Sequence, residues 1–233
     1  MKTRILSSFV LLMLICFSSV DALAQKNEAV RQLEAAERSQ LGRLQSQSPR
    51  DNLTGQINGY EWVDLGLSVK WATCNVGASS PEQYGDSFAW GEISTKSEYG
   101  YESCKTYQKD FSDISGGSIY DAARANWGGS WRMPTKAEIE ELQNNCQWDW
   151  TGMGGHYGYK VTSKKNGQSI FLPAAGYMSG TTLNLDGKYG HYWSSTPLED
   201  DTINANMIFF YSDYYELYWF TRNLGQSIRP VTE

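Results

Sequence analysis

The chain has 233 residues, a formal net charge of −6 and a pI of about 5.1. This acidic balance argues against a nucleic-acid-binding surface, which needs clustered Lys and Arg, and it suits an exported protein. The length favours one substantial domain, and 9 Trp, 15 Tyr and 22 Gly predict a compact, turn-rich and aromatic fold.

The first residues carry the pattern of a secretory signal peptide. Lys2 and Arg4 precede an apolar run over residues 5–20, and residues 22–24 supply the small side chains that a signal peptidase accepts. The run is interrupted by serines and is short for a bilayer span, which disfavours a permanent transmembrane helix. We predict a signal peptide over residues 1–24 and export to the periplasm, the cell surface or the medium.

Residues 25–57 are charged, Gln-rich and almost free of aromatic side chains. We predict a polar, partly helical stalk or linker for this segment. Its apolar residues lie at roughly helical spacings: Val30, Leu33, Ala36, Leu41 and Leu44. Two interpretations remain, self-association through residues 28–45 or a solvated tether.

The globular domain is predicted to span residues 58–233. Residues 60–65 and 67–71 are typical of two short strands. Residues 96–117 are polar and turn-rich, which predicts a loop held by aromatic anchors. Residues 121–127, DAARANW, begin with an acid and continue with helix-forming residues, so we predict a short helix there.

The best helix signal of the chain follows at Thr135. Thr135 is a favourable N-cap, and Glu138 is placed to reach back to the free backbone N–H of Thr135, which makes a capping box. The apolar residues after it form a partial stripe, so the helix should cover a core with one side only.

Three turn signals follow this helix and predict hairpins. Asn166-Gly167, Asp186-Gly187 and Ser212-Asp213 each lie between runs rich in aliphatic and aromatic residues. Residues 226–231 are predicted to form a final strand.

The cysteines allow two interpretations. If Cys16 leaves with the signal peptide, the odd number Cys74, Cys104 and Cys146 remains. These are either three buried or partly buried thiols or one internal disulfide and one thiol. Lipidation of Cys16 is disfavoured because a large residue precedes it, and a zinc site is disfavoured because the chain has no CxxC motif or Cys/His cluster.

Five motifs occur in order along residues 58–232: VDLGLSVKWATCNVGASSPEQYGDSFAWGE, DAARANWGGSWRMPTKAEIEEL, SIFLPAAGY, YWSSTP and SIRPV. Together they resemble the Fibrobacter succinogenes major paralogous domain, which is common in secreted proteins of gut Bacteroidetes. RMPTKAEIEEL and IRPV also resemble signatures of formylglycine-generating-enzyme-like domains. The resemblance implies an α+β, C-type-lectin-like fold: a twisted antiparallel sheet with two short helices and long loops.

We expect no enzyme activity. Formylglycine-generating enzymes use cysteines in the later part of their fold, and this chain has none there. His191 with Ser194 or Ser195 and Asp200 or Asp201 could be drawn as a nucleophilic triad, but the sequence lacks a nucleophile elbow. An enzyme on this scaffold is therefore the weakest of three functional hypotheses.

A calcium-assisted, carbohydrate-binding lectin-like domain is the second hypothesis. Calcium-dependent C-type lectins carry Glu-Pro-Asn or Gln-Pro-Asp in a long loop and Trp-Asn-Asp on a neighbouring strand, and these motifs do not occur here. Asp149 and residues 199–201 offer oxygen ligands, but acidic loops are usually solvated. We expect no metal and no other cofactor.

A non-catalytic binding module for a protein, peptide or glycan is the favoured hypothesis. Eight aromatic residues fall within residues 209–220, on a hairpin of which one face alone can point into the core. A sheet covered by loops on its second side is the alternative.

The alternation of residues 214–220 predicts the binding face. An unpaired carboxylate is costly to bury, so Glu216 should mark the exposed side. We therefore expect Trp219 in the core. The residues predicted to line the ligand site are Tyr214, Glu216, Tyr218, Arg222 and Asn223.

Overall fold

The computed structural model describes residues 27–38 and 53–233. The chain divides into two compact units, Met1–Asp51 and Asn52–Glu233. Residues 27–38 form an α-helix whose side chains are all exposed. The predicted signal peptide and residues 39–45 of the predicted self-association segment lie outside the described residues. Within the described ranges, no helix has the length and apolar character needed to cross a membrane.

The second unit begins before residue 58. Strand β1 (Thr54–Ile57) pairs antiparallel with β2 (Tyr60–Val63) through a turn at Asn58-Gly59. Both turn residues have positive φ, 52° for Asn58 and 86° for Gly59, as a tight two-residue hairpin turn requires. The predicted boundary between a stalk over residues 25–57 and a domain over residues 58–233 therefore lies a few residues too late in the sequence. Strand β1 was not predicted because it is short and polar.

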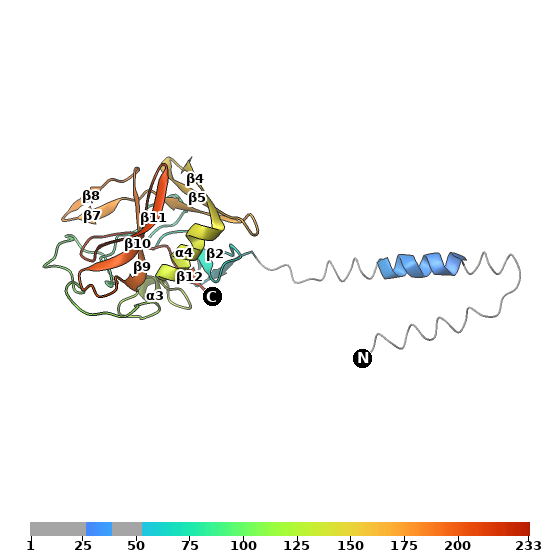
Figure 1. Cartoon of the computed structure of the whole chain (residues 1–233), viewed down its shortest axis with the longest axis horizontal. Helices are drawn as coiled ribbons and strands as arrows, with labels where there is room; N and C mark the ends of the chain where they lie inside the picture. The colour runs from blue at the N-terminus through green and yellow to red at the C-terminus, as the bar shows by residue number, and fades with distance from the viewer. Residues whose placement is uncertain (1–26, 39–52) are drawn as a thin grey trace, which may run out of the picture. The chain divides into compact units, whose positions relative to one another are not determined.

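In the described part of the chain, strands β1–β12 form four small antiparallel sheets and not one continuous twisted sheet (Figure 1). The first has the order β1-β2-β3-β12 and adds β3 (Lys70–Ala72) and β12 (Val231–Thr232). The second contains β4 (Cys146–Met153), β5 (His156–Ser163) and β6 (Ser169–Pro173). The third has the order β11-β10-β9, with β9 (Gly190–Pro197), β10 (Asn204–Tyr211) and β11 (Tyr214–Thr221). The fourth is a hairpin of β7 (Tyr177–Ser179) and β8 (Thr182–Asn184).

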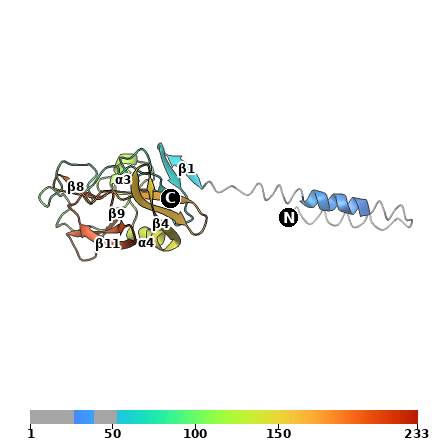
Figure 2. The same ribbon diagram turned by 90° about the horizontal axis from the view of Figure 1, so that it is seen from above.

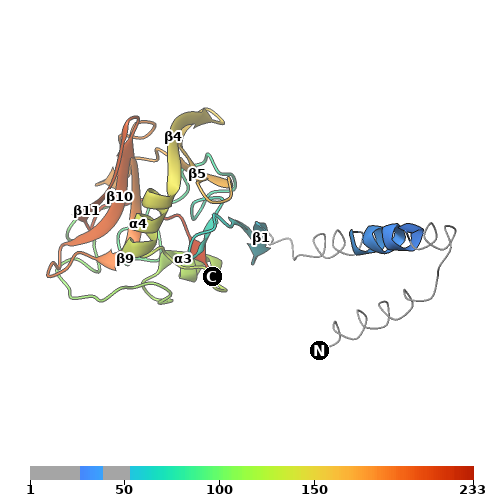
Figure 3. The same ribbon diagram turned by 45° about the vertical axis from the view of Figure 1, so that its right-hand side comes forward.

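Two short helices complete the domain, which is of mixed α+β class. They are α3 (Ala122–Trp127) and α4 (Lys136–Asn145). Figure 3 shows α4 between the β9-β10-β11 sheet and the β4-β5 hairpin. Figure 2 shows β11 and α4 on one side of the domain and β1 on the opposite side.

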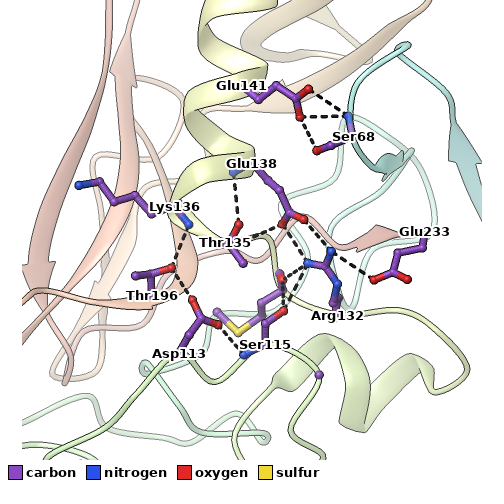
Figure 4. A network of polar contacts seen from close by, with 12 residues as sticks. Ser68, Asp113, Ser115, Arg132, Thr135, Lys136, Glu138, Glu141, Thr196 and Glu233 are labelled. Atoms are coloured by element: carbon purple, nitrogen blue, oxygen red, sulfur yellow. Dashed lines mark hydrogen bonds and ion pairs between the residues drawn. The ribbon is translucent and has the colours of Figure 1, made fainter.

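Helix α4 begins with the predicted capping box. The Thr135 hydroxyl accepts from the Glu138 N–H, and the Glu138 carboxylate accepts from the Thr135 N–H at 2.8 Å (Figure 4). Glu138 also pairs with Arg132, with Nη1 to Oε2 at 2.9 Å and Nη2 to Oε1 at 2.6 Å. The Lys136 N–H donates to Thr196 Oγ1 at 3.0 Å, so the first turn of α4 is fixed to β9.

We expect Thr135→Ala to lower the free energy of unfolding by about 1 kcal/mol, because it removes the acceptor of the first-turn N–H. Thermal or urea unfolding would measure this loss. Thr151→Ala, on the exposed part of β4, is a suitable control because its side chain caps no helix. Equal stabilities for the Thr135 variant and the wild type would contradict the role of the capping box.

Two hydrophobic clusters hold these elements together. The first lies where α4, the β4-β5-β6 sheet and the inner face of the β9-β10-β11 sheet meet, and it includes Ile139, Leu142, Tyr159, Leu172, Ile208 and Phe210. The second packs α3 and the preceding loops against the other face of β9 and β10, and it includes Trp90, Trp127, Trp131, Trp193 and Met207. The buried indole of Trp193 donates to the Phe88 carbonyl at 2.9 Å, and that of Trp90 donates to the Ser194 carbonyl at 2.9 Å. Both indoles thus keep a hydrogen bond inside the core.

Two of the three predicted hairpins are confirmed. Strands β5 and β6 flank Asn166-Gly167, and β10 and β11 flank Ser212-Asp213. The hairpin predicted around Asp186-Gly187 is wrong: β8 pairs with β7, and β9 pairs with β10. The Gly187 N–H instead donates to the Ala174 carbonyl at 2.7 Å, so this turn folds back on the chain after β6. Cys74, Cys104 and Cys146 are free thiols, the first of the two interpretations above.

The closing motif contributes a fully buried arginine. Arg229 is 1% exposed and donates from Nε to Asn75 Oδ1 at 2.8 Å. Its Nη1 donates to the carbonyls of Ala72 and Thr73 at 3.1 and 2.7 Å, and its Nη2 donates to that of Phe171 at 2.9 Å. Burial lowers the pKa of this guanidinium, which is not paired with a carboxylate of residues 27–38 or 53–233. Arg229 therefore joins the β3 end of the first sheet to β6 of the second.

Candidate functional site

The outer face of the β10-β11 hairpin carries the predicted aromatic side chains. The register pairs Tyr211 with Tyr214, Phe209 with Glu216 and Met207 with Tyr218. Paired residues share a face of an antiparallel sheet, so all six lie on the face opposite to Ile208 and Phe210. The predicted alternation of faces on β11 is therefore confirmed.

This face is hollowed. A hollow of about 390 Å³ is lined by seven residues of β9, β10 and β11, which we call the aromatic hollow: His191, Met207, Phe209, Tyr211, Tyr214, Tyr218 and Phe220. Two of the five predicted site residues, Tyr214 and Tyr218, line it and are 39% and 46% exposed. Its size is within the range of small-ligand pockets in proteins.

The rings of the aromatic hollow are tilted against one another. The ring centroid of Phe209 lies 5.1 Å from that of His191, 5.8 Å from that of Tyr211 and 6.3 Å from that of Tyr214, with interplanar angles near 60°. Tyr211 and Tyr214 stack at 5.2 Å. The ring of Phe209 is therefore inclined to the rings of its neighbours, whereas Tyr211 and Tyr214 are close to parallel.

Glu216 lies on this face between Tyr214 and Tyr218, and its side chain is exposed. Its carboxylate accepts a short hydrogen bond from the Tyr214 hydroxyl. This hydrogen bond raises the pKa of the Tyr214 phenol, which keeps it protonated and a donor. The predicted site residue Glu216 therefore places a negative charge beside two of the rings that line the hollow.

His191 lines the aromatic hollow from β9 and is 3% exposed. The rings of Tyr177, Tyr189, Phe209 and Phe220 surround it, with centroids 4.9 to 6.5 Å away. Desolvation lowers the pKa of His191 to about 4, so its imidazole is neutral at neutral pH. Among the described residues, its Nδ1 is one of seven buried side-chain nitrogen or oxygen atoms without a hydrogen-bond partner. Of the residues that carry these seven atoms, His191 is the one that lines the aromatic hollow.

The low pKa of His191 makes stability pH-dependent. In the unfolded chain the imidazole takes up a proton near pH 6.5, but in the folded domain it stays neutral down to pH about 4. The unfolded state therefore binds more protons between these values, and the free energy of unfolding should fall as the pH is lowered from 6.5 to 4. The full loss attributable to His191 is about 3 kcal/mol.

An NMR titration of the His191 ring protons measures the folded pKa directly, and a midpoint near pH 4 is expected. Urea unfolding of His191→Phe should show a weaker pH dependence over the same interval than the wild type. A midpoint above pH 6 would contradict the assignment of His191 as a buried neutral side chain.

The predictions for Arg222 and Asn223 are wrong, because both side chains are buried, at 1% and 4% exposure. Arg222 donates from Nε to the Asn204 carbonyl at 3.0 Å, from Nη1 to the Lys109 carbonyl at 2.8 Å and from Nη2 to the Asp201 carbonyl at 2.8 Å. Its guanidinium also lies 4.5 Å from the ring centroid of Trp90. Arg222 thus fixes two loops to the end of β11 and is not available to a ligand.

The prediction that Trp219 lies in the core is also wrong. Trp219 shares a face with Tyr215 and Leu217, as alternation requires, but it is 45% exposed. Strand β11 is an edge of its sheet, and only Tyr215 and Leu217 pack against the first cluster beneath α4. The indole instead stacks on Tyr218, with centroids 5.4 Å apart and planes within 8°.

A second, shallower hollow of about 290 Å³ adjoins the first and shares Tyr211 with it. Its other lining residues are Trp150, Tyr157, Gly187, Lys188, Tyr189 and Ser212. It differs from the aromatic hollow in carrying the ammonium group of Lys188.

The sequence-based candidates for catalysis and metal binding are not assembled into a site. Ser194 and Ser195 are fully buried, and the Ser194 hydroxyl donates to the Asn206 carbonyl at 2.8 Å. Asp201 accepts from the N–H groups of Ile203 and Asn204 at 2.6 and 2.8 Å, which is turn chemistry. Among the described residues, no group of three or more His, Cys, Asp or Glu side chains could hold a metal ion.

The fold and the site together define a small α+β domain of antiparallel sheets with an open aromatic surface. A family model described as a domain of unknown function, DUF8237, matches residues 158–231. This span includes all seven residues of the aromatic hollow. A search of curated proteins and a search of solved structures each found no match.

Sequence reasoning missed five lining residues, His191, Met207, Phe209, Tyr211 and Phe220. The two-residue turn at Ser212-Asp213 could have revealed Phe209 and Tyr211, because a hairpin with such a turn has a fixed register. His191 had no such signal, since β9 reaches β10 through a longer loop and a register shift between Ala205 and Met207.

Proposed function

We propose that the chain is an exported, non-catalytic binding module whose ligand site is the aromatic hollow. The observation that carries this proposal is the combination, in one hollow, of partly exposed tyrosine rings and a buried histidine nitrogen without a partner. Tyrosine offers a large, rigid and amphipathic contact surface that loses little conformational entropy on binding. Side chains of this kind are enriched where proteins recognise proteins, peptides and glycans.

Export and family membership are proposed from the sequence. The signal-peptide pattern of residues 1–24 supports export, and the five ordered motifs support membership of the Fibrobacter succinogenes major paralogous domain with a C-type-lectin-like fold. The α+β architecture, with antiparallel sheets and two short helices, agrees with that resemblance at the level of fold class.

A glycan and peptide array probed with the full chain would identify a ligand. We then expect Tyr218→Ala to weaken binding of that ligand at least tenfold, which corresponds to about 1.4 kcal/mol, because it removes a wall of the hollow. Its melting temperature should match that of the wild type, since Tyr218 is 46% exposed.

Tyr101→Ala is the matched control, because Tyr101 is an exposed tyrosine that does not line the hollow. It should bind the ligand as the wild type does. Undiminished binding by the Tyr218 variant would overturn the assignment of the site.

A further inference from the structure

We infer that the aromatic hollow binds a basic side chain, the guanidinium of an arginine or the ammonium of a lysine, presented by a peptide or protein partner. This inference rests on the proposed function and names the chemical class of its ligand. Three observations support a basic ligand: the geometry of the rings, the distribution of charge around the hollow and the imidazole of His191 in its lining.

The geometry suits a cation. A cation is attracted to the face of an aromatic ring when it lies within about 6 Å of the ring centroid. The centroids of Phe209, Tyr211 and Tyr214 lie 5.2 to 6.3 Å from one another, so one cation can be within that range of more than one ring. Tyr189, which lines the second hollow, stacks on Phe209 with ring centroids 5.6 Å apart.

The charge distribution points the same way. Glu216 is the charged side chain on this face of β11, and its hydrogen bond from Tyr214 holds it beside the rings. The seven lining residues include no Lys or Arg, and the one basic ring among them, His191, is neutral at neutral pH. The chain as a whole carries a net charge of −6, which favours the approach of a basic partner.

The imidazole of His191 adds a polar group to the lining of the hollow. Guanidinium and ammonium groups are obligate hydrogen-bond donors, and a neutral imidazole has one nitrogen that accepts. A ligand N–H that reaches this ring would donate to the nitrogen that carries no proton. A sugar also stacks on aromatic rings, but the carboxylate of Glu216 beside Tyr214 favours a cation over a neutral ligand.

The test uses the full chain and four pentapeptides of sequence Gly-Gly-X-Gly-Gly, acetylated and amidated at their ends, in which X is arginine, lysine, citrulline or norleucine. Methyl glucoside is the fifth probe. Citrulline keeps the shape of arginine without its charge, and norleucine keeps the carbon chain of lysine. Binding is followed by NMR on the ring signals of the tyrosines. We expect the arginine or the lysine peptide to bind at least tenfold more tightly than its neutral counterpart.

Glu216→Gln should weaken binding of the basic peptide about tenfold without changing the melting temperature. Glu61→Gln is the matched control, because it removes the same charge from an exposed position on β2, in another sheet. Equal binding within both pairs, arginine with citrulline and lysine with norleucine, would overturn the inference. Equal behaviour of the two glutamine variants would also overturn it.

The two proposals fail in different ways. If methyl glucoside or the norleucine peptide shifts the Tyr214 and Tyr218 signals while the basic peptides do not, the site stands and the cationic ligand is wrong. If no probe shifts these signals and the ligand found by array binds elsewhere, both proposals are wrong.

Discussion

Replacing Arg229 with alanine should lower the free energy of unfolding by about 5 kcal/mol, the largest effect expected for any single substitution considered. The guanidinium satisfies four buried acceptors: Asn75 Oδ1 and the carbonyls of Ala72, Thr73 and Phe171. Each acceptor left without a donor in the core costs on the order of 1 kcal/mol or more, and the removed side chain leaves a cavity. Urea unfolding monitored by tryptophan fluorescence measures the loss.

Arg229→Lys separates the shape of the side chain from its charge. A lysine keeps the positive charge but cannot reach four acceptors that are arranged for a planar fork, so more than half of the loss should remain. If Arg229→Lys has the same urea midpoint as the wild type, the fork-shaped hydrogen bonding of Arg229 does not stabilise the contact between the first and second sheets.

Arg222→Ala should lower the free energy of unfolding by about 4 kcal/mol, which corresponds to roughly 10 °C in melting temperature for a domain of this size. Its guanidinium donates to the carbonyls of Asn204, Lys109 and Asp201 and lies over the ring of Trp90. The substitution removes all four contacts and leaves a void between two loops and β11. A thermal melt followed by circular dichroism measures the effect.

The same variant distinguishes the structural role of Arg222 from the role in ligand binding that the sequence suggested. A variant that melts with the wild type but no longer binds the ligand would show that Arg222 contacts the ligand. Tyr218→Ala, which should melt with the wild type, is the reference for that comparison.

The features predicted correctly are formed by residues that are close together in the sequence. The capping box at Thr135 and Glu138 involves residues three apart, and the hairpin at Ser212-Asp213 closes across two residues. Such features depend on short-range chemistry that a sequence displays directly. The same holds for the alternation of faces on β11, which places Tyr214 and Tyr218 together.

The positions of Arg222, Trp219 and His191 were not predicted because they depend on contacts between residues far apart in the sequence. Arg222 is buried because Lys109, more than a hundred residues away, offers its carbonyl to the guanidinium, and the path of that loop has no periodic pattern. Trp219 is exposed because β11 is an edge strand, and alternation alone does not tell an edge from a central strand. His191 pairs with Phe209 beyond a register shift between Ala205 and Met207, so its position does not follow from the loop between β9 and β10.

An NMR titration with the ligand found by array tests most directly whether the aromatic hollow is the ligand site. It records the chemical-shift change of each aromatic ring proton when the ligand is added. We expect the largest shifts at Phe209, Tyr211, Tyr214 and Tyr218 and a new hydrogen bond to the ring of His191. Shifts confined to the face formed by β1 and β2, with these rings unchanged, would contradict it.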